Sequence, residues 1–329
     1  MKVLSWFYQV FASLHRTLYN SNYFKKFKIS KPVLSIGNIS MGGSGKTPLT
    51  AFLYSELIKQ KCVPAIITKS YKAGLVKSQI VPMNADPSLY GDEAVFFKTL
   101  FPESIVISGP HKWESAKLAE TLKEVDVVLL DDGFQHHRLF KNWNGVVVDL
   151  SNQQDSAFFR ESKSALQYAQ VLFCSRVELA GIQVYEDFKV QMAFDLPIFQ
   201  IVNRLITFKN LASNESTLSF PFKSGLLVSA IGRPEQFHQM MKNQSPLVQF
   251  EIHNFEDHHP YTQQDVTLIE SKAKELKLEQ IFCTEKDWVK IQKFQLEPEF
   301  WTVVQLRAAV EPEQDWKNYF QKLCKDLEI

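Results

Sequence analysis

The stretch LSIGNISMGGSGKTPLT, residues 34–50, passes from an apolar run through a glycine-rich turn into an amphipathic segment. Its Gly-Lys-Thr ending is the tail of the phosphate-binding pattern G-x-x-x-x-G-K-[ST], although Ser40 stands where that pattern has its first glycine. Gly42, Gly43 and Gly45 still allow the backbone to curl, so that its N–H groups converge on phosphate oxygens. Pro48 suits the first turn of a helix, where its missing N–H costs no hydrogen bond. The stretch therefore predicts a strand, a variant phosphate loop and a helix.

A second motif, VVLLDDGFQHHRL, supplies the acidic residues that such a loop requires. In a nucleotide site of this kind Lys46 reaches the β- and γ-phosphates, and the Thr47 hydroxyl takes one Mg²⁺ position. Asp131 and Asp132 follow a buried apolar run, and a carboxylate at the end of a neighbouring parallel strand holds the Mg²⁺ directly or through water. Asp-Asp-Gly is also good turn chemistry by itself. Together with the phosphate loop, the pair predicts a metal–nucleotide site.

The rest of the chain alternates short apolar runs with amphipathic stretches, which is typical of βαβ units and a mostly parallel sheet. We predict a P-loop NTPase-like sheet with helices on both faces in residues 25–178, and a smaller α/β domain in residues 179–329. The boundary is placed in the loosely patterned segment that follows residue 174. Thr262 and Asp265 form a capping-box pattern, which predicts the start of a helix. Strands are predicted at residues 33–36, 64–67, 105–107, 127–130, 146–148, 171–174, 226–229, 248–252, 281–284 and 301–304.

Composition limits the possible functions. The 329 residues are 45% apolar and 22% charged, which is typical of a soluble globular protein. A net charge of +1 argues against nucleic acid as the main partner. The four cysteines show no metal-binding spacing, so free thiols in a reducing cytoplasm are favoured over disulfides or a metal site.

The N-terminal arm, residues 1–24, has a different character. No acidic residue occurs before Glu56, and the apolar residues of the arm fall on one helical face. Arg16 falls on the opposite, polar face. Charges interrupt the run too often for a membrane span. Two interpretations remain open: an amphipathic helix packed on its own domain, or one lying in the cytoplasmic leaflet beside anionic lipid.

Three clusters are ambiguous taken alone. Asp92, in GDEAVFF, can be a reactive carboxylate or part of a helix N-terminus. Arg160 and Glu161, in FFRES, can form a surface ion pair or a phosphate clamp. His258, in FEDHHP, is favoured as a hydrogen-bonding or acid–base group over a metal ligand, because no third ligand lies at helical spacing. The TEKD segment, residues 284–287, does not match the pattern that reads guanine.

The order GGSGKTP, GDE, DDGFQHHRL, RE, DHH and TEKD resembles the tetraacyldisaccharide 4′-kinases of lipid A biosynthesis. The resemblance runs from the N-terminal arm to TEKD and is most specific at residues 37–48 and 131–139. It implies an ATP- and Mg²⁺-dependent kinase that phosphorylates the 4′-hydroxyl of a tetraacylated glucosamine disaccharide 1-phosphate, forming lipid IVA. The implied location is the cytoplasmic face of the inner membrane of a Gram-negative-type bacterium, with the protein peripheral or anchored by its N-terminal arm. The implied partners are the lipid disaccharide and the lipid surface, without nucleic acid or a protein partner.

The same resemblance assigns roles to residues. Asp92 takes the place of the catalytic aspartate that accepts the proton of the sugar hydroxyl, and His258, from the second domain, supports it once the cleft closes. Arg160 and Glu161 match a pair near the reacting groups. Thr47, Asp131 and Asp132 are the implied metal ligands. The implied nucleotide-binding residues are Ser40, Met41, Gly42, Gly43, Ser44, Gly45, Lys46, Thr47 and Gln135.

The chain departs from the family at two places. The second strand usually leads into Ser-Arg-Gly-Tyr-Gly, whereas TKSYKAG stands here with Lys69 in place of the arginine, which loses bidentate phosphate recognition. HKWES replaces the usual Asp-Arg after the fourth strand. These changes suggest a divergent branch and not a different reaction. The alternatives are a membrane-associated P-loop ATPase acting as a switch, and a cytosolic small-molecule kinase or ligase.

Overall fold

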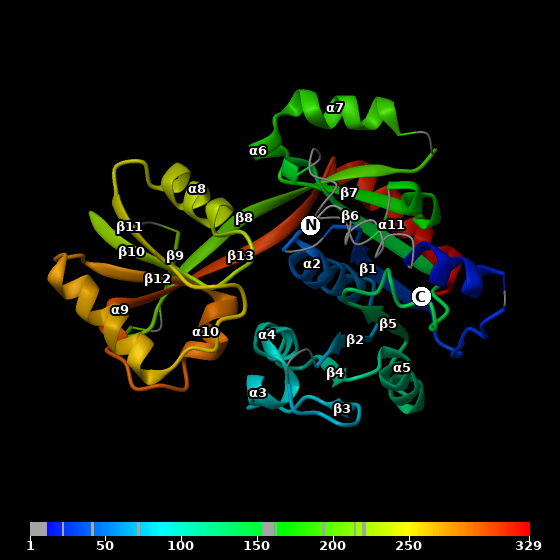
Figure 1. Ribbon diagram of the computed structural model, residues 1–329, viewed down its shortest axis with the longest axis horizontal. Coiled ribbons are helices and arrows are strands. Elements are labelled where there is room, and N and C mark those ends of the chain that lie inside the picture. The colour runs from blue at the N-terminus through cyan, green and yellow to red at the C-terminus, as the bar shows by residue number, and fades with distance from the viewer. Residues whose placement is uncertain are drawn as a thin grey trace. The chain divides into compact units, whose positions relative to one another are not determined.

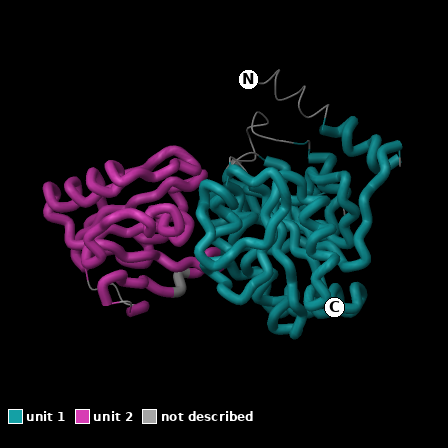
Figure 2. The backbone as a smooth tube through the Cα atoms, turned by 90° about the horizontal axis from the view of Figure 1, so that it is seen from below, with its two compact units in different colours: residues 1–202, 308–329 teal, residues 203–307 magenta. Residues whose placement is uncertain are grey.

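The structure, a computed structural model, describes residues 12–21, 23–40, 43–70, 73–152, 161, 163–192, 195–213, 215–218 and 222–329. It forms two compact units, coloured separately in Figure 2: residues 1–202 with 308–329, and residues 203–307. Both units have strands and helices in alternation, as the sequence predicts. The two units are described separately below.

The first unit has β1 (Val33–Asn38) in the middle of its sheet, parallel to β5 (Val127–Leu130) on one side and to β6 (Trp143–Asp149) on the other. Beyond β5 lie β2 (Pro64–Lys69) and β4 (Ile105–Gly109), both parallel, and the short antiparallel β3 (Gln79–Ile80). Beyond β6 lie β7 (Val171–Ser175) and the start of β8 (Ile198–Asn210). The carboxyl ends of the parallel strands therefore share one edge, where ligands of open α/β sheets bind.

Helices cover both faces of this sheet (Figure 1). Along β5, Val127 and Leu129 pack into one core while Val128 and Leu130 pack into the opposite one, because successive strand side chains alternate. The first core includes α2 (Lys46–Lys59), α4 (Asp92–Leu100) and α11 (Glu313–Leu327). The second face is covered by α5 (Lys112–Thr121) and α7 (Ile182–Gln191). Shorter elements are α3 (Pro87–Tyr90), α6 (Val177–Ala180), and the 3₁₀ turns η1 (Leu150–Asn152) and η3 (Lys163–Tyr168).

The segment predicted as a loose boundary is folded. Tyr185 and Phe188 of α7 are buried in the first unit, and β8 pairs with β7, Ile198 opposite Leu172. The division between compact units therefore falls after residue 202 and not after residue 178. The chain also returns to the first unit at its end, because Trp316 of α11 is buried in the core around β1. The sequence of α7 and β8 has no local pattern that distinguishes it from a linker, and that of α11 has none that distinguishes it from the second domain.

The second unit has β10 (Ser224–Ser229) between β11 (Gln249–Asn254) and β12 (Gln280–Thr284), with β13 (Trp301–Glu311) beside β12, all parallel. β9 (Ser216–Thr217) pairs antiparallel with the end of β8. Its helices are α8 (Pro234–Gln244), α9 (Gln263–Glu275) and α10 (Glu285–Ile291), followed by the 3₁₀ turn η4 (Pro298–Phe300). The capping box at Thr262 and Asp265 is present at the start of α9, so this prediction is confirmed.

The described part of the N-terminal arm is helical over residues 12–20. Residues 1–11, which carry most of the predicted amphipathic helix, lie outside the described residues. The prediction for Arg16 is wrong: this residue is buried, whereas Leu14 is 56% exposed. The reason is an ion pair that Arg16 forms with Glu161. Within the described residues, no helix has the length and apolar character needed to cross a membrane.

Candidate active site

The phosphate loop connects β1 to α2 at the shared edge of the first sheet. Gly45, immediately before α2, has φ 95°, a left-handed conformation that favours glycine. The Asn38 side-chain amide donates to the hydroxyls of Ser40 (3.4 Å) and Ser44 (2.8 Å), both of which are buried. The loop therefore has a left-handed residue at Gly45, and Asn38 at the end of β1 stabilises it through two hydrogen bonds. Met41 and Gly42 lie outside the described residues.

A buried ion pair also supports the loop, and sequence reasoning missed it. Arg176, directly after β7, donates to the Gly43 carbonyl and pairs with Asp149 at the end of β6. Both side chains are almost fully buried. The sequence offered one signal: Asp149 ends one buried strand, and Arg176 directly follows another. Nothing in that signal linked Arg176 to the loop before the strands were assembled.

The Asp131–Phe134 turn lies beside the phosphate loop, as predicted, because β5 and β1 are neighbours. The Gly133 amide donates to the Ile36 carbonyl at 2.7 Å, tying the turn to β1. A Cβ atom at Gly37 would lie 2.3 Å from the Phe134 Cβ, so only glycine allows this approach. Gln135 donates to the Asn38 carbonyl at 2.6 Å and so lies against the strand end that enters the loop.

Asp131 and Asp132 have different surroundings. Asp132 has φ 49° and lies near Lys46, with Nζ 3.5 Å from Oδ1. Asp131 is 1% exposed; its Oδ1 accepts from the Thr50 hydroxyl at 2.8 Å, but its Oδ2 has no hydrogen-bond partner. Burial, reinforced by the negative charge of Glu93, raises the pKa of Asp131 to about 7. A buried carboxylate oxygen without a donor is costly unless a ligand engages it.

These residues fit a magnesium ion. Thr47, Asp131 and Asp132 offer oxygen donors, which Mg²⁺ prefers, and the open oxygen of Asp131 is a natural position for a ligand or for a metal-bound water. Among the described residues no group of three or more His, Cys, Asp or Glu side chains is arranged to hold a metal. A site with one or two carboxylates completed by nucleotide phosphates is the usual Mg²⁺ arrangement.

The GDE motif lies next to the loop. Asp92 and Glu93 occupy the first turn of α4, and the N-cap position is taken by Gly91 at φ 91°. Glu93 accepts a hydrogen bond from the Thr47 hydroxyl at 3.2 Å, which brings the start of α4 to the predicted metal ligand. Sequence reasoning grouped Asp92 with Glu93 but did not connect either of them to Thr47.

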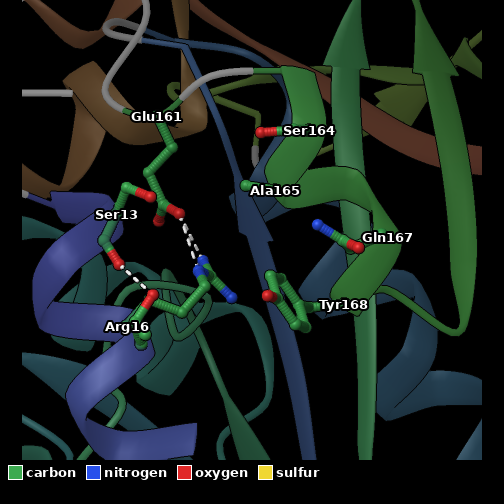
Figure 3. Close-up of a pocket in the computed structure, with 8 residues that line it drawn as sticks. Ser13, Arg16, Glu161, Ser164, Ala165, Gln167 and Tyr168 are labelled. Atoms are coloured by element: carbon green, nitrogen blue, oxygen red, sulfur yellow. Dashed lines mark hydrogen bonds and ion pairs between the residues drawn. The ribbon is translucent and has the colours of Figure 1, made fainter. Parts of the chain in front are cut away.

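Glu161 is engaged with the N-terminal arm (Figure 3). Its carboxylate pairs with the Arg16 guanidinium, Nε to Oε2 at 2.9 Å, and both side chains are buried. The Arg16 guanidinium also lies 4.3 Å from the centre of the Phe134 ring, in the DDGF turn. The Glu161 amide donates to the Ile39 carbonyl at 3.2 Å, just before the phosphate loop. Arg160 lies outside the described residues.

The DHH and TEKD motifs both belong to the second unit. His258 is exposed and has φ 62°; its amide donates to the Ala230 carbonyl at 3.2 Å, and its Nε2 lies 3.8 Å from the Asp257 carboxylate. Asp287, from TEKD, is fully buried and accepts from the Ala230 amide at 2.9 Å. The TEKD aspartate and the histidine are thus joined through one residue, Ala230.

Comparison with known proteins identifies the family of the chain. The family model described as LpxK: Tetraacyldisaccharide-1-P 4'-kinase matches residues 1–325. The chain belongs to this family. It is therefore a tetraacyldisaccharide 4′-kinase, and the sequence-based identification is confirmed.

Individual relatives agree with the family assignment. The tetraacyldisaccharide 4′-kinase of Bdellovibrio bacteriovorus is 31% identical over 303 residues, covering 89% of each chain. That of Syntrophus aciditrophicus is 29% identical and covers 99% of this chain and 93% of the relative. The crystal structure of LpxK from Aquifex aeolicus in complex with ATP matches with a TM-score of 0.76 at 24% identity, covering 97% of this chain and 96% of that one. The structural match confirms the predicted α/β fold.

Proposed function

We propose that this kinase transfers the γ-phosphate of ATP through the site formed by the phosphate loop, the Asp131–Phe134 turn and the start of α4. The observation that carries the proposal is the meeting of three motifs: Lys46 beside Asp132, and Thr47 beside Glu93. The Aquifex aeolicus relative was solved with ATP, which supports ATP as the donor here. The acceptor is the 4′-hydroxyl of a tetraacyldisaccharide 1-phosphate, and the product is lipid IVA.

Lys46 and the loop amides bind the nucleotide phosphates, and Ser40, Ser44 and Gln135 maintain the shape of the loop. Thr47, Asp131 and Asp132 hold Mg²⁺, which neutralises charge on the transferring phosphoryl group when it is bound. Phosphoryl transfer requires mainly positioning and charge stabilisation from a protein, and these residues supply both.

Asp92 is the proposed base for the sugar hydroxyl. It lies in the first turn of α4, next to the glutamate that contacts Thr47. His258 is proposed to support it during turnover, although the two residues belong to different units. Replacing His258 with alanine should lower kcat by about 10²-fold while ATP binding changes little, because proton transfer contributes 10²- to 10⁴-fold in such reactions. Equal losses in kcat and in ATP affinity would refute this role.

Glu161 was assigned with Arg160 to the reacting groups, and its observed contacts support a positioning role. It joins the Arg16 helix to the residue before the phosphate loop. We propose that Arg160 contacts a phosphate while Glu161 fixes this part of the backbone. Arg160→Ala should then weaken ATP or acceptor binding, whereas Glu161→Gln should mainly lower the thermal midpoint.

We propose that the N-terminal arm docks on the cytoplasmic face of the inner membrane. Tyr23 is 76% exposed and Phe24 39% exposed, and Lys25 follows them directly, a combination that suits an anionic lipid surface. Replacing Tyr23 and Phe24 with serine should reduce co-flotation with anionic vesicles. Unchanged flotation of that variant would contradict docking through these residues.

The reaction is tested by transfer of labelled γ-phosphate from ATP to tetraacyldisaccharide 1-phosphate in detergent micelles. Wild type and the control Asp326→Ala, an exposed position on α11, should label the lipid. Asp92→Ala should label almost none. ATP hydrolysis without lipid labelling, insensitive to Asp92, would instead favour a membrane-associated ATPase.

A further inference from the structure

Two lysines hold the backbone of the Asp131–Phe134 turn. Lys112, the first residue of α5, donates to the carbonyls of Asp131 and of Asp132, the latter at 2.7 Å. Lys141, just before β6, donates to the carbonyls of Gly133 and Phe134, both at 2.9 Å. Four consecutive carbonyls are therefore bound by two ammonium groups that come from different parts of the chain.

Removing these two lysine side chains from water costs free energy. Lys112 is only 2% exposed, and Lys141 is partly buried. Removal from water, assisted by the positive charge of Arg16, lowers the pKa of Lys141 to about 7. Buried ammonium groups are rare in proteins because their desolvation is unfavourable. Neutral donors would satisfy the same carbonyls at lower cost, so a requirement for positive charge or for a fixed backbone is implied.

The geometry indicates the second of these requirements, a fixed backbone. Asp132 has φ 49°, a conformation that residues other than glycine seldom adopt, and its carboxylate lies near Lys46. Carbonyl contacts on both sides of this residue hold it in that conformation.

We propose that Lys112 and Lys141 form a carbonyl clamp, which fixes the Asp131–Phe134 backbone so that both carboxylates are ready to receive Mg²⁺ with the nucleotide. The inference rests on the proposed metal-binding role of the turn. Each ammonium group already contacts two carbonyls, so the lysines are positioning residues and not phosphate ligands. The HKWES segment thereby gains a proposed function, because it supplies Lys112.

The test uses Lys112→Met and Lys141→Met, with Lys31→Met as a matched control. Lys31 also donates to a backbone carbonyl, that of Val125, but at the opposite end of β5. The readouts are the Mg²⁺ concentration that half-saturates binding of a fluorescent ATP analogue, kcat for lipid phosphorylation, and the thermal midpoint.

We expect each clamp variant to raise half-saturating Mg²⁺ by at least about tenfold, since residues that orient metal ligands typically contribute 10- to 100-fold to affinity or activity. Lys31→Met should shift it less than about twofold, with a comparable loss of thermal stability. Where a methionine variant does not fold, Lys112→Gln and Lys141→Gln replace it; they keep a donor but lose the charge, and a shift of about threefold or more is expected.

Half-saturating Mg²⁺ within about twofold of wild type in the folded clamp variants would overturn the proposal, as would an equal shift in Lys31→Met. A failure of the proposed function can be distinguished from a failure of the clamp. If wild type binds the ATP analogue with Mg²⁺ but labels no lipid, the assigned reaction is wrong while the clamp is still tested by Mg²⁺ binding. If Mg²⁺ does not influence nucleotide binding in wild type, the metal site itself is wrong.

Discussion

Asp131 and Asp287 are both buried aspartates at the carboxyl ends of parallel strands, one in each unit. Asp131 follows β5 and Asp287 lies in the first turn after β12. The Asp287 carboxylate is satisfied by the protein: Oδ1 accepts from the Ala230 amide and the Tyr261 hydroxyl, and Oδ2 accepts from the Thr284 hydroxyl at 2.6 Å. Asp131 has one donor, Thr50, and leaves Oδ2 without a partner.

The difference separates a carboxylate that the protein satisfies completely from one that it leaves partly open. Strand-end position and burial are the same, so neither property by itself identifies a site. What differs is whether the protein completes the hydrogen bonds of the carboxylate. An oxygen that the fold leaves open lies beside the phosphate loop, where a metal or water can complete it.

The largest expected effect is that of Asp131→Asn on catalysis. Loss of the proposed metal ligand should reduce kcat for lipid phosphorylation by at least about 100-fold, in line with the loss of one preorganised electrostatic contact. The thermal midpoint without nucleotide should stay the same or rise, because a buried carboxylate whose Oδ2 has no hydrogen-bond donor is removed. A large fall in the midpoint would assign Asp131 to stability instead.

Asp287→Ala should have the opposite effect: it should lower stability and leave ATP binding intact. It leaves the Ala230 amide and the hydroxyls of Tyr261 and Thr284 without their acceptor, so the free energy of unfolding should fall by about 2 kcal/mol. Urea unfolding followed by fluorescence measures the loss. ATP binding, which we assign to the first unit, should persist where the variant is folded; loss of binding without loss of stability would break the comparison.

The pH dependence of stability sharpens the contrast. Burial raises the pKa of Asp287 above its usual range, so the folded chain binds this proton more tightly than the unfolded chain. Its contribution to stability is full below the unfolded pKa, near 3.8, and is lost as pH rises through the folded value. Asp287→Asn should therefore gain stability relative to wild type as pH rises. Parallel urea titrations from about pH 3.5 upward to about 8 check this, and a constant difference across the whole range would contradict it.

The smallest expected effect is that of Thr50→Val, which removes the single donor to Asp131. A loss of about 1 kcal/mol in unfolding free energy is expected, with a reduction in kcat of less than about tenfold. Urea unfolding and steady-state assays measure the two. A reduction as large as that of Asp131→Asn would mean that Thr50 shares the role of the aspartate.

Much of the first unit follows from local patterns. The phosphate loop between β1 and α2, and the position of Asp131 and Asp132 on the neighbouring strand, are predictable because apolar runs and glycine spacing identify a parallel sheet with a common carboxyl edge. The capping box of α9 is a local signal in the same way.

The supporting contacts of the candidate site are not predictable from the sequence. Arg176, Lys112 and Lys141 are single charged residues without a characteristic spacing, and their partners lie far away in the chain. Arg16 has a helical periodicity that indicates the exposed face, yet a distant glutamate holds it inside. The extent of β8 and the return of α11 depend on pairing and packing across the sheet. All of these features depend on contacts between residues that are far apart in the chain, and not on residue type.

The most direct measurement is the rate of phosphate transfer from ATP to tetraacyldisaccharide 1-phosphate, compared in wild type, Asp131→Asn and Asp287→Asn under identical Mg²⁺. The account predicts that Asp287→Asn, which keeps an acceptor for the Ala230 amide, labels lipid within about fivefold of wild type, while Asp131→Asn loses at least about 100-fold with its fold intact. Equal activity in the two variants, or an active Asp131→Asn enzyme, would contradict the assignment of Asp131 to the metal site.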